Sequence, residues 1–116
     1  MSTDEIFKHV QSVKENVAQF RKKFKAHPSA GQFSILDDAI RNLPPLVKFA
    51  VQLDYKEVKA NGVRSLIRAC DNLSRTALTI SDEEVDDFLY LVSYLNRGAD
   101  LLLEGCEDTL NGEFTE

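Results

Sequence analysis

The 116-residue sequence lacks tryptophan and contains one methionine, two cysteines, three prolines and five glycines. The two cysteines, Cys70 and Cys106, stand in no CxxC or Cys/His spacing, which argues against a disulfide framework and against the common zinc motifs. Proline and glycine are too scarce for a collagen-like or low-complexity chain. No apolar stretch approaches the roughly 18 residues that a membrane-spanning helix needs. These absences leave a globular class, and we expect one domain over residues 1–116.

The sequence also lacks an excess of basic residues, since 14 Lys and Arg against 19 Asp and Glu give a formal net charge of -5. A negative chain is repelled by nucleic acid and by anionic lipid, so nucleic acid is not the expected partner. Residues 1–5 have neither the basic region nor the apolar run of a signal peptide. Two thiols that behave as small buried hydrophobes suit a reducing compartment. We therefore expect a cytoplasmic protein, although these observations do not exclude a nuclear location.

What the sequence does contain is apolar residues at helical spacing, three and four apart, in four segments. We expect helices near residues 3–26, 33–53, 55–78 and 82–106. Short connections make consecutive helices antiparallel, so the predicted fold is all-α, an antiparallel up-and-down four-helix bundle. The core is expected to include residues that share the inward phase of each helix: Val13, Val17, Phe20, Leu36, Ile40, Leu66, Leu73, Val92 and Leu95.

Local signals mark the irregular places. Pro44-Pro45 lies inside the second apolar pattern, and missing amide donors predict a kink or a brief restart near Leu43. Asp54–Asn61 is helix or connector, with the well-packed part of the third helix expected from about Gly62. Ser81 and Glu84 have the spacing of a capping box, which predicts the start of the fourth helix. That helix is expected to end near Gly105, and the acidic residues from about 108 are expected to fray.

No residue pattern points to catalysis or to a metal. Adjacent acids such as Asp37-Asp38 and Asp86-Asp87 diverge by about 100° on a helix and do not converge on one ion. His9 and His27 have no ligand or nucleophile at a useful spacing and are expected at the surface. The sequence has no Gly-rich phosphate loop, GxSxG or HExxH motif. We expect no enzyme activity, no cofactor and no metal.

The segment from Ser81 to Asp108 carries a second apolar stripe on the side opposite its core stripe. Three large side chains form it, with Arg97 and Gly98 beside them, and they are the candidate partner-binding residues: Tyr90, Tyr94 and Leu101. Either the helix is covered on both sides, or the second stripe contacts a partner. Gly98 and Gly105 would let a foreign helix approach closely. The leading hypothesis is a noncatalytic interaction domain, of adaptor or scaffold type in signalling, that binds an amphipathic helix or another subunit, with a homodimer included.

An alternative function depends on a basic cluster near the end of the first helix: Arg21, Lys22, Lys23 and Lys25. Such a cluster favours a regulatory module that binds an acidic lipid or an acidic peptide. The same charges also complement the negative end of the helix dipole, which is the simpler interpretation.

Overall fold

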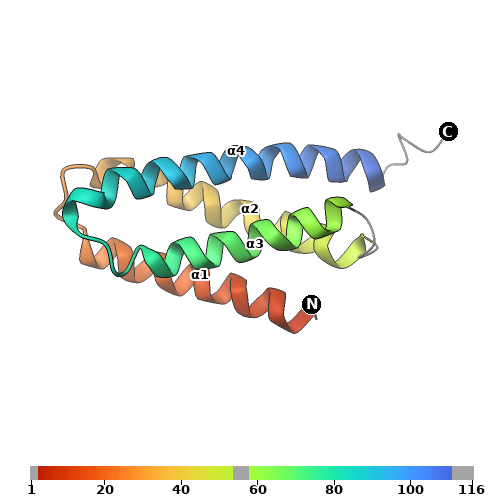
Figure 1. The fold of residues 1–116 in the computed structure, drawn as a ribbon, viewed down its shortest axis with the longest axis horizontal. Helices are drawn as coiled ribbons and strands as arrows, with labels where there is room; N and C mark the ends of the chain where they lie inside the picture. The colour runs from red at the N-terminus through yellow and green to blue at the C-terminus, as the bar shows by residue number, and fades with distance from the viewer. Residues whose placement is uncertain (1–2, 54–57, 111–116) are drawn as a thin grey trace.

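The computed structural model describes residues 3–53 and 58–110, and four long helices account for most of them (Figure 1). They are α1 (Thr3–Lys23), α2 (Ser34–Gln52), α3 (Val58–Thr76) and α4 (Val85–Leu110), with the short 3-10 helices η1 (Ala30–Gln32) and η2 (Asp82–Glu84) before α2 and α4. The described residues contain no β-strand. The predicted all-α four-helix bundle is confirmed.

Consecutive helices run antiparallel, but the most extensive packing joins the two parallel pairs, α1 with α3 and α2 with α4. The pairs α3 with α4 and α2 with α3 also pack against each other, so α2 and α3 are the central helices. α1 and α4 lie at opposite edges of the bundle (Figure 1) and meet at one end, where the Phe20 and Phe88 rings lie 4.8 Å apart. The interpretation of α4 as a helix covered on both sides is therefore wrong.

The narrow apolar stripe of α1 is buried along its whole length: Ile6, Val10, Val13, Val17, Phe20 and Phe24. At its C-terminal end Phe20 contacts the rings of Phe24 and Phe33, with centroids 4.9 and 5.1 Å away. The predicted core residues Leu36 and Val92 are also buried. Four others, Ile40, Leu66, Leu73 and Leu95, are only half-buried, which corrects the expectation. The helical phase was right for these four, but it does not say how completely a neighbouring helix covers them.

Two expected helix boundaries are wrong. α4 continues to Leu110, past the end expected near Gly105. Of the tail expected to fray from about 108, residues 108–110 are helical and residues 111–116 lie outside the described part. α3 is packed before Gly62, because Ala60 is fully buried. Lys59 makes this possible: its ammonium donates to the Thr109 hydroxyl at 2.7 Å while its stem lies against Gly105. Of the ambiguous segment Asp54–Asn61, residues 54–57 lie outside the description and the remainder is helical.

Two local predictions are confirmed. α2 is one helix with a bend of 25°, and Pro44 and Pro45 lie inside it. The bend has its cause there, since two residues without an amide hydrogen leave the carbonyls of Ile40 and Arg41 without their helical donors. The capping box is also present, with the Ser81 amide donating to the Glu84 carboxylate at 3.1 Å. This local interaction gives α4 a defined start.

Candidate partner-binding face

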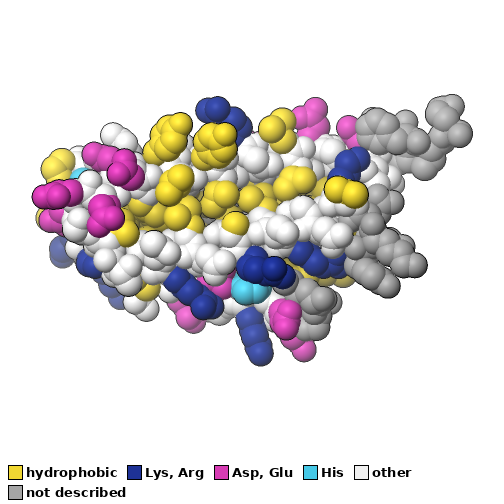
Figure 2. Space-filling view, in the orientation of Figure 1, with side chains coloured by type: hydrophobic (Ala, Val, Ile, Leu, Met, Phe, Trp, Pro, Cys, Tyr) yellow, Lys and Arg dark blue, Asp and Glu magenta, His cyan; other side chains and the backbone are white. Residues whose placement is uncertain are grey.

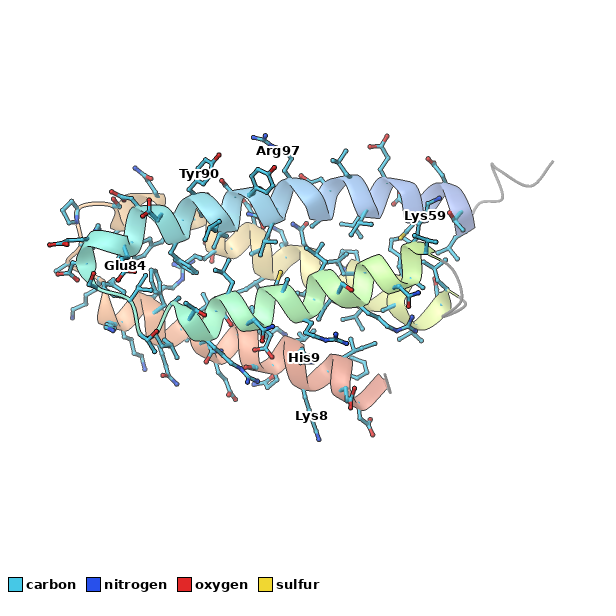
Figure 3. The ribbon with its side chains drawn as sticks, viewed as in Figure 1. Lys8, His9, Lys59, Glu84, Tyr90 and Arg97 are labelled. Atoms are coloured by element: carbon cyan, nitrogen blue, oxygen red, sulfur yellow. The ribbon has the colours of Figure 1, made fainter. Side chains whose placement is uncertain are left out.

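The second apolar stripe of α4 lies on the molecular surface. Tyr90, Tyr94 and Leu101 are 67%, 64% and 67% exposed. The side chains of Tyr90 and Arg97 point away from the bundle (Figure 3). Leu91, 49% exposed, lies next to this row on the side of α4 that turns towards α3. We call Tyr90, Leu91, Tyr94 and Leu101 the α4 outer face.

An apolar groove continues this surface between α3 and α4. Figure 2 shows hydrophobic side chains in a band along the middle of the molecule, below the row that stands on α4. All four helices contribute to the lining of the groove, which includes Val13, Val17, Leu36, Ser74 and Phe88. The five further lining residues are Cys70 and Leu73 of α3, Val92 and Leu95 of α4, and Ala39 of α2. A cavity of about 30 Å³ lies among these residues, which is the volume of about one water molecule. We call these five residues the α3–α4 groove, and they explain why Leu73 and Leu95 are only half-buried.

The two glycines near the outer face differ. A Cβ atom added at Gly98 would meet nothing within 4 Å, so the space above this residue is open. A Cβ atom at Gly105 would lie 3.4 Å from Lys59 of α3. Gly105 therefore faces its own bundle and is not part of the outer face, whereas Gly98 belongs to the surface that a partner helix can approach.

Carboxylates stand at both ends of the α4 outer face. Asp86 and Asp87 precede it, and Glu104, Glu107 and Asp108 follow it along the helix. Figure 2 shows acidic side chains gathered at the η2 end of the molecule and again beyond the apolar row. The Asp86 carboxylate accepts a hydrogen bond from the Ser29 hydroxyl, which ties this end of α4 to the loop after α1. The face is thus apolar in the middle apart from Arg97, and negative at its ends, while the exposed Asp100 lies on the side of α4 that borders Asp38 and Arg41 of α2.

The basic cluster of α1 is partly used inside the protein. Arg21 donates to the Phe33 carbonyl at 3.1 Å and forms an ion pair with Asp37. The Lys23 ammonium donates to the Leu78 carbonyl at 2.9 Å, close to the end of α3. Lys22 and Lys25 are exposed on the surface. Two of the four cations therefore hold connections between helices, and only part of the cluster faces solvent.

A buried polar network between α1 and α3 was not predicted from the sequence. Asp71 is fully buried on α3 and accepts a hydrogen bond from His9 Nδ1 at 2.5 Å and two from the Arg75 guanidinium at 3.1 Å. Burial alone raises the pKa of the Asp71 carboxyl, but hydrogen bonds from Ser12 and His9 and the charge of Arg75 outweigh it and hold this pKa below its usual value.

His9 is partly at the surface, with 24% of its side chain exposed, but its bond to the buried Asp71 was not expected. Asn16 continues the line, donating to the Ser74 hydroxyl at 3.1 Å. A signal was available, since His9, Ser12 and Asn16 recur at helical spacing along one side of α1 and Asp71 borders the apolar arc of α3. Its geometry is that of an interhelical clamp, and His9 and Arg75 also line a surface hollow between α1 and α3.

The remaining candidate groups have ordinary surroundings. His27 is also half-buried, where Nδ1 accepts from the Ser29 amide at 3.0 Å and Nε2 donates to the Asp82 carbonyl at 2.9 Å. Cys70 and Cys106 are free thiols, and burial raises the pKa of Cys70 to about 11. Among residues 3–53 and 58–110, no three His, Cys, Asp or Glu side chains are grouped so as to hold a metal ion.

None of the described helices is long and apolar enough to cross a membrane. Comparisons with protein-family models, with curated proteins and with solved structures found no match for this chain.

Proposed function

We propose that the chain is a noncatalytic protein-interaction domain, of the kind found in adaptors and scaffolds, that binds a partner helix or another subunit through the α4 outer face. The observation that carries the proposal is the row of Tyr90, Tyr94 and Leu101, each about two thirds exposed along one line of a helix. Tyrosine is enriched at interface hot spots because it combines a large apolar ring with a polar tip. Large apolar side chains that gather on one exposed face, with polar residues around them, favour a binding site.

An estimate of area indicates that the outer face and the groove act together. A tyrosine contributes about 150–250 Å² to an interface, so the exposed two thirds of Tyr90 and Tyr94 amount to roughly 250 Å². At about 25 cal/mol per Å² this area gives roughly 6 kcal/mol, which falls within the cost of association of about 4–15 kcal/mol. The adjoining α3–α4 groove adds apolar area in contact with Leu73 and Leu95, and measurable affinity requires that the partner cover both.

A noncatalytic role agrees with the chemistry of the groove. Its lining is apolar apart from Ser74, whose hydroxyl donates to the Asp71 carbonyl at 2.8 Å. A catalytic site needs several polar groups that converge on one space, and ligand cavities usually have volumes of about 300–1,000 Å³. The arrangement supports recognition of an apolar surface, since burial raises the pKa of the lining thiol of Cys70 to about 11 and no charged side chain among the described residues lines the groove.

The test compares Tyr94→Asp with the matched control Phe7→Asp. Phe7 is an aromatic residue of α1, 54% exposed, on the opposite edge of the bundle. Both variants should keep the wild-type circular dichroism spectrum, because both side chains are on the surface. Tyr94→Asp should remove binding, since a carboxylate at an apolar contact loses its hydration without gaining a partner.

The measurement is in-cell cross-linking followed by mass spectrometry, with sedimentation equilibrium to detect self-association. Support requires a protein, or a second copy of the chain, that wild type and Phe7→Asp capture and folded Tyr94→Asp does not. Equal capture by all three chains would refute the use of this face. Loss of helicity in Tyr94→Asp would show that the ring is part of the core, which also contradicts the proposal.

A further inference from the structure

We infer that the occupant of the α4 outer face is a basic amphipathic helix from another protein, and that a second copy of this chain does not fit. The inference rests on the proposed function above and adds the chemistry of the partner. Three observations carry it: the order of charges along α4, the direction of the α3 arginines, and the open groove beside the face.

The charges along α4 are almost all negative. The helix holds six acidic residues and one basic residue, Arg97, and η2 adds three further acids immediately before it. Five of the six acids lie before or after the apolar row from Tyr90 to Leu101, and the sixth, Asp100, lies within its span on the side of α4 that borders α2. Complementary potentials favour a partner with apolar residues in the middle of its stripe and Lys or Arg at both ends.

Self-pairing of this face brings like charges together in both orientations. An antiparallel pair of α4 helices places Asp86 and Asp87 of one copy near Glu104, Glu107 and Asp108 of the other, and a parallel pair places each acid near its own equivalent. Opposed like charges are destabilising. Arg97 at the centre of the face offers one cation, which does not compensate the two acidic ends.

The arginines of α3 do not serve this face, whereas Lys59 of α3 reaches the far end of α4, where its ammonium donates to the Thr109 hydroxyl. Arg75 binds Asp71 in the interface with α1, and Arg68 lies with Lys8 and Glu5 around a surface hollow between α1 and α3. The border of the α3–α4 groove therefore carries no row of arginines to attract an acidic helix. The acids of α4 remain the charges that a docked helix meets.

The dimensions specify the partner further. Asp87 and Glu104 are seventeen positions apart on α4, which at 1.5 Å per residue is about 26 Å. A partner helix of about 18 residues spans this distance. Its apolar side chains at positions i, i+3, i+4 and i+7 would cover Tyr94 and Leu101 and enter the groove between Leu73 and Leu95.

The experiment is a selection from a displayed library of 18-residue helical peptides. All members share a leucine stripe at i, i+3, i+4 and i+7, and the flanking positions are randomised among Lys, Arg, Glu, Asp, Gln and Ser. The library is selected on the wild-type domain and counter-selected on Tyr94→Asp, with Phe7→Asp as the control domain. We expect enriched peptides to carry Lys or Arg at both ends and to bind Phe7→Asp as well as wild type.

A charge-neutralised domain provides the second measurement. In Asp87→Asn/Glu104→Gln, the Kd of an enriched basic peptide should rise roughly two- to thirty-fold, as expected for two exposed ion pairs, and its salt dependence should decrease. Asp87 and Glu104 are exposed and bind no side chain within residues 3–53 and 58–110, so folding should be unchanged. Asp4→Asn/Glu15→Gln removes the same total charge from α1 and should leave the Kd unchanged.

The possible outcomes distinguish a failure of this inference from a failure of the proposed function. Enrichment of acidic or uncharged peptides that require Tyr94 overturns the basic partner and leaves the interaction function standing. A dimer of the chain alone that dissociates in Tyr94→Asp overturns it in favour of a second copy. An equal Kd for a basic peptide on the α4-neutralised and the α1-neutralised domains also overturns it. If no peptide distinguishes wild type from Tyr94→Asp, the proposed function falls as well.

Discussion

Replacing Asp71 by asparagine is expected to lower the free energy of unfolding by about 1–3 kcal/mol at pH 7. The carboxylate is fully buried and binds His9 and Arg75. A hydrogen bond to a charged group contributes about 1.5–3 kcal/mol. The hydrogen bond from His9 should contribute most of this value, because the His9 side chain is only 24% exposed. The ion pair with Arg75 should contribute about 0.3–0.5 kcal/mol, because Arg75 is 62% exposed and the pair has i, i+4 spacing. Asparagine keeps the volume and one acceptor, so no cavity cost is added.

The loss should depend on pH in a defined direction. The folded-state pKa of Asp71 is lower than its ordinary value of 3.8, so the folded protein holds the ionised form more strongly than the unfolded chain does. Stability from this shift is fully present above the unfolded pKa and is lost as the pH falls through the folded pKa. The difference between wild type and Asp71→Asn that comes from this shift should therefore shrink below about pH 4.

Urea unfolding followed by far-UV circular dichroism at pH 7, 5 and 3.5 measures this difference. The control is Asp38→Asn, which removes an exposed carboxylate paired with Arg41 on α2 and should change stability by less than about 0.5 kcal/mol. The reasoning fails if Asp71→Asn stays within about 0.5 kcal/mol of wild type at pH 7. It also fails if the gap does not narrow at pH 3.5.

Three further measurements examine the packing. Val92→Ala should lower the free energy of unfolding by about 2–3 kcal/mol, because Val92 is only 5% exposed. Leu95→Ala should lower it by less than about 2 kcal/mol, because Leu95 borders the open groove. The reverse order in urea unfolding would contradict the groove. Ser81→Ala should cost about 0.5–2 kcal/mol by thermal unfolding through loss of the cap on Glu84, and an unchanged Tm would contradict that role. The rate of Cys70 alkylation in a Cys106→Ala chain should rise about tenfold per pH unit from pH 7 to 9.5 without levelling, because burial raises its pKa to about 11; a plateau near pH 9 would show an ordinary thiol.

The class of fold could be predicted because helical periodicity is a local property. The stripe of α1 repeats without a miss from Ile6 to Phe24, and all of it is buried. The bend at Pro44-Pro45 and the cap at Ser81 were predictable for the same reason, since a missing amide hydrogen or a side-chain acceptor acts within one helical turn. The end of α4 was not predictable from Gly105, because the contact of Lys59 with Gly105 and Thr109 comes from another helix.

The residues of the candidate face could be predicted from the sequence, but their exposure and the groove beside them could not. The spacing of Tyr90, Tyr94 and Leu101 defines one line on a helix, and the exposure of that line depends on which helices neighbour α4. The groove has no sequence signature, since Leu73 and Leu95 have the same phase as fully buried residues. The clamp of His9 on Asp71 joins positions 62 residues apart, and no local pattern specifies which polar line meets which.

The sequence by itself determined the four helices, their inward sides, the break in α2 and the start of α4, because these depend on interactions within a few residues. The tertiary structure alone decided that α1 and α4 occupy opposite edges, that the second stripe of α4 faces solvent, and that Asp71 has a charged partner inside the bundle. These features depend on how whole helices pack, because the same amphipathic helices can be arranged in several ways and the observed arrangement is the one in which their surfaces fit together best. The candidate binding face is a product of both: its residues are set by the sequence, and its exposure by the bundle.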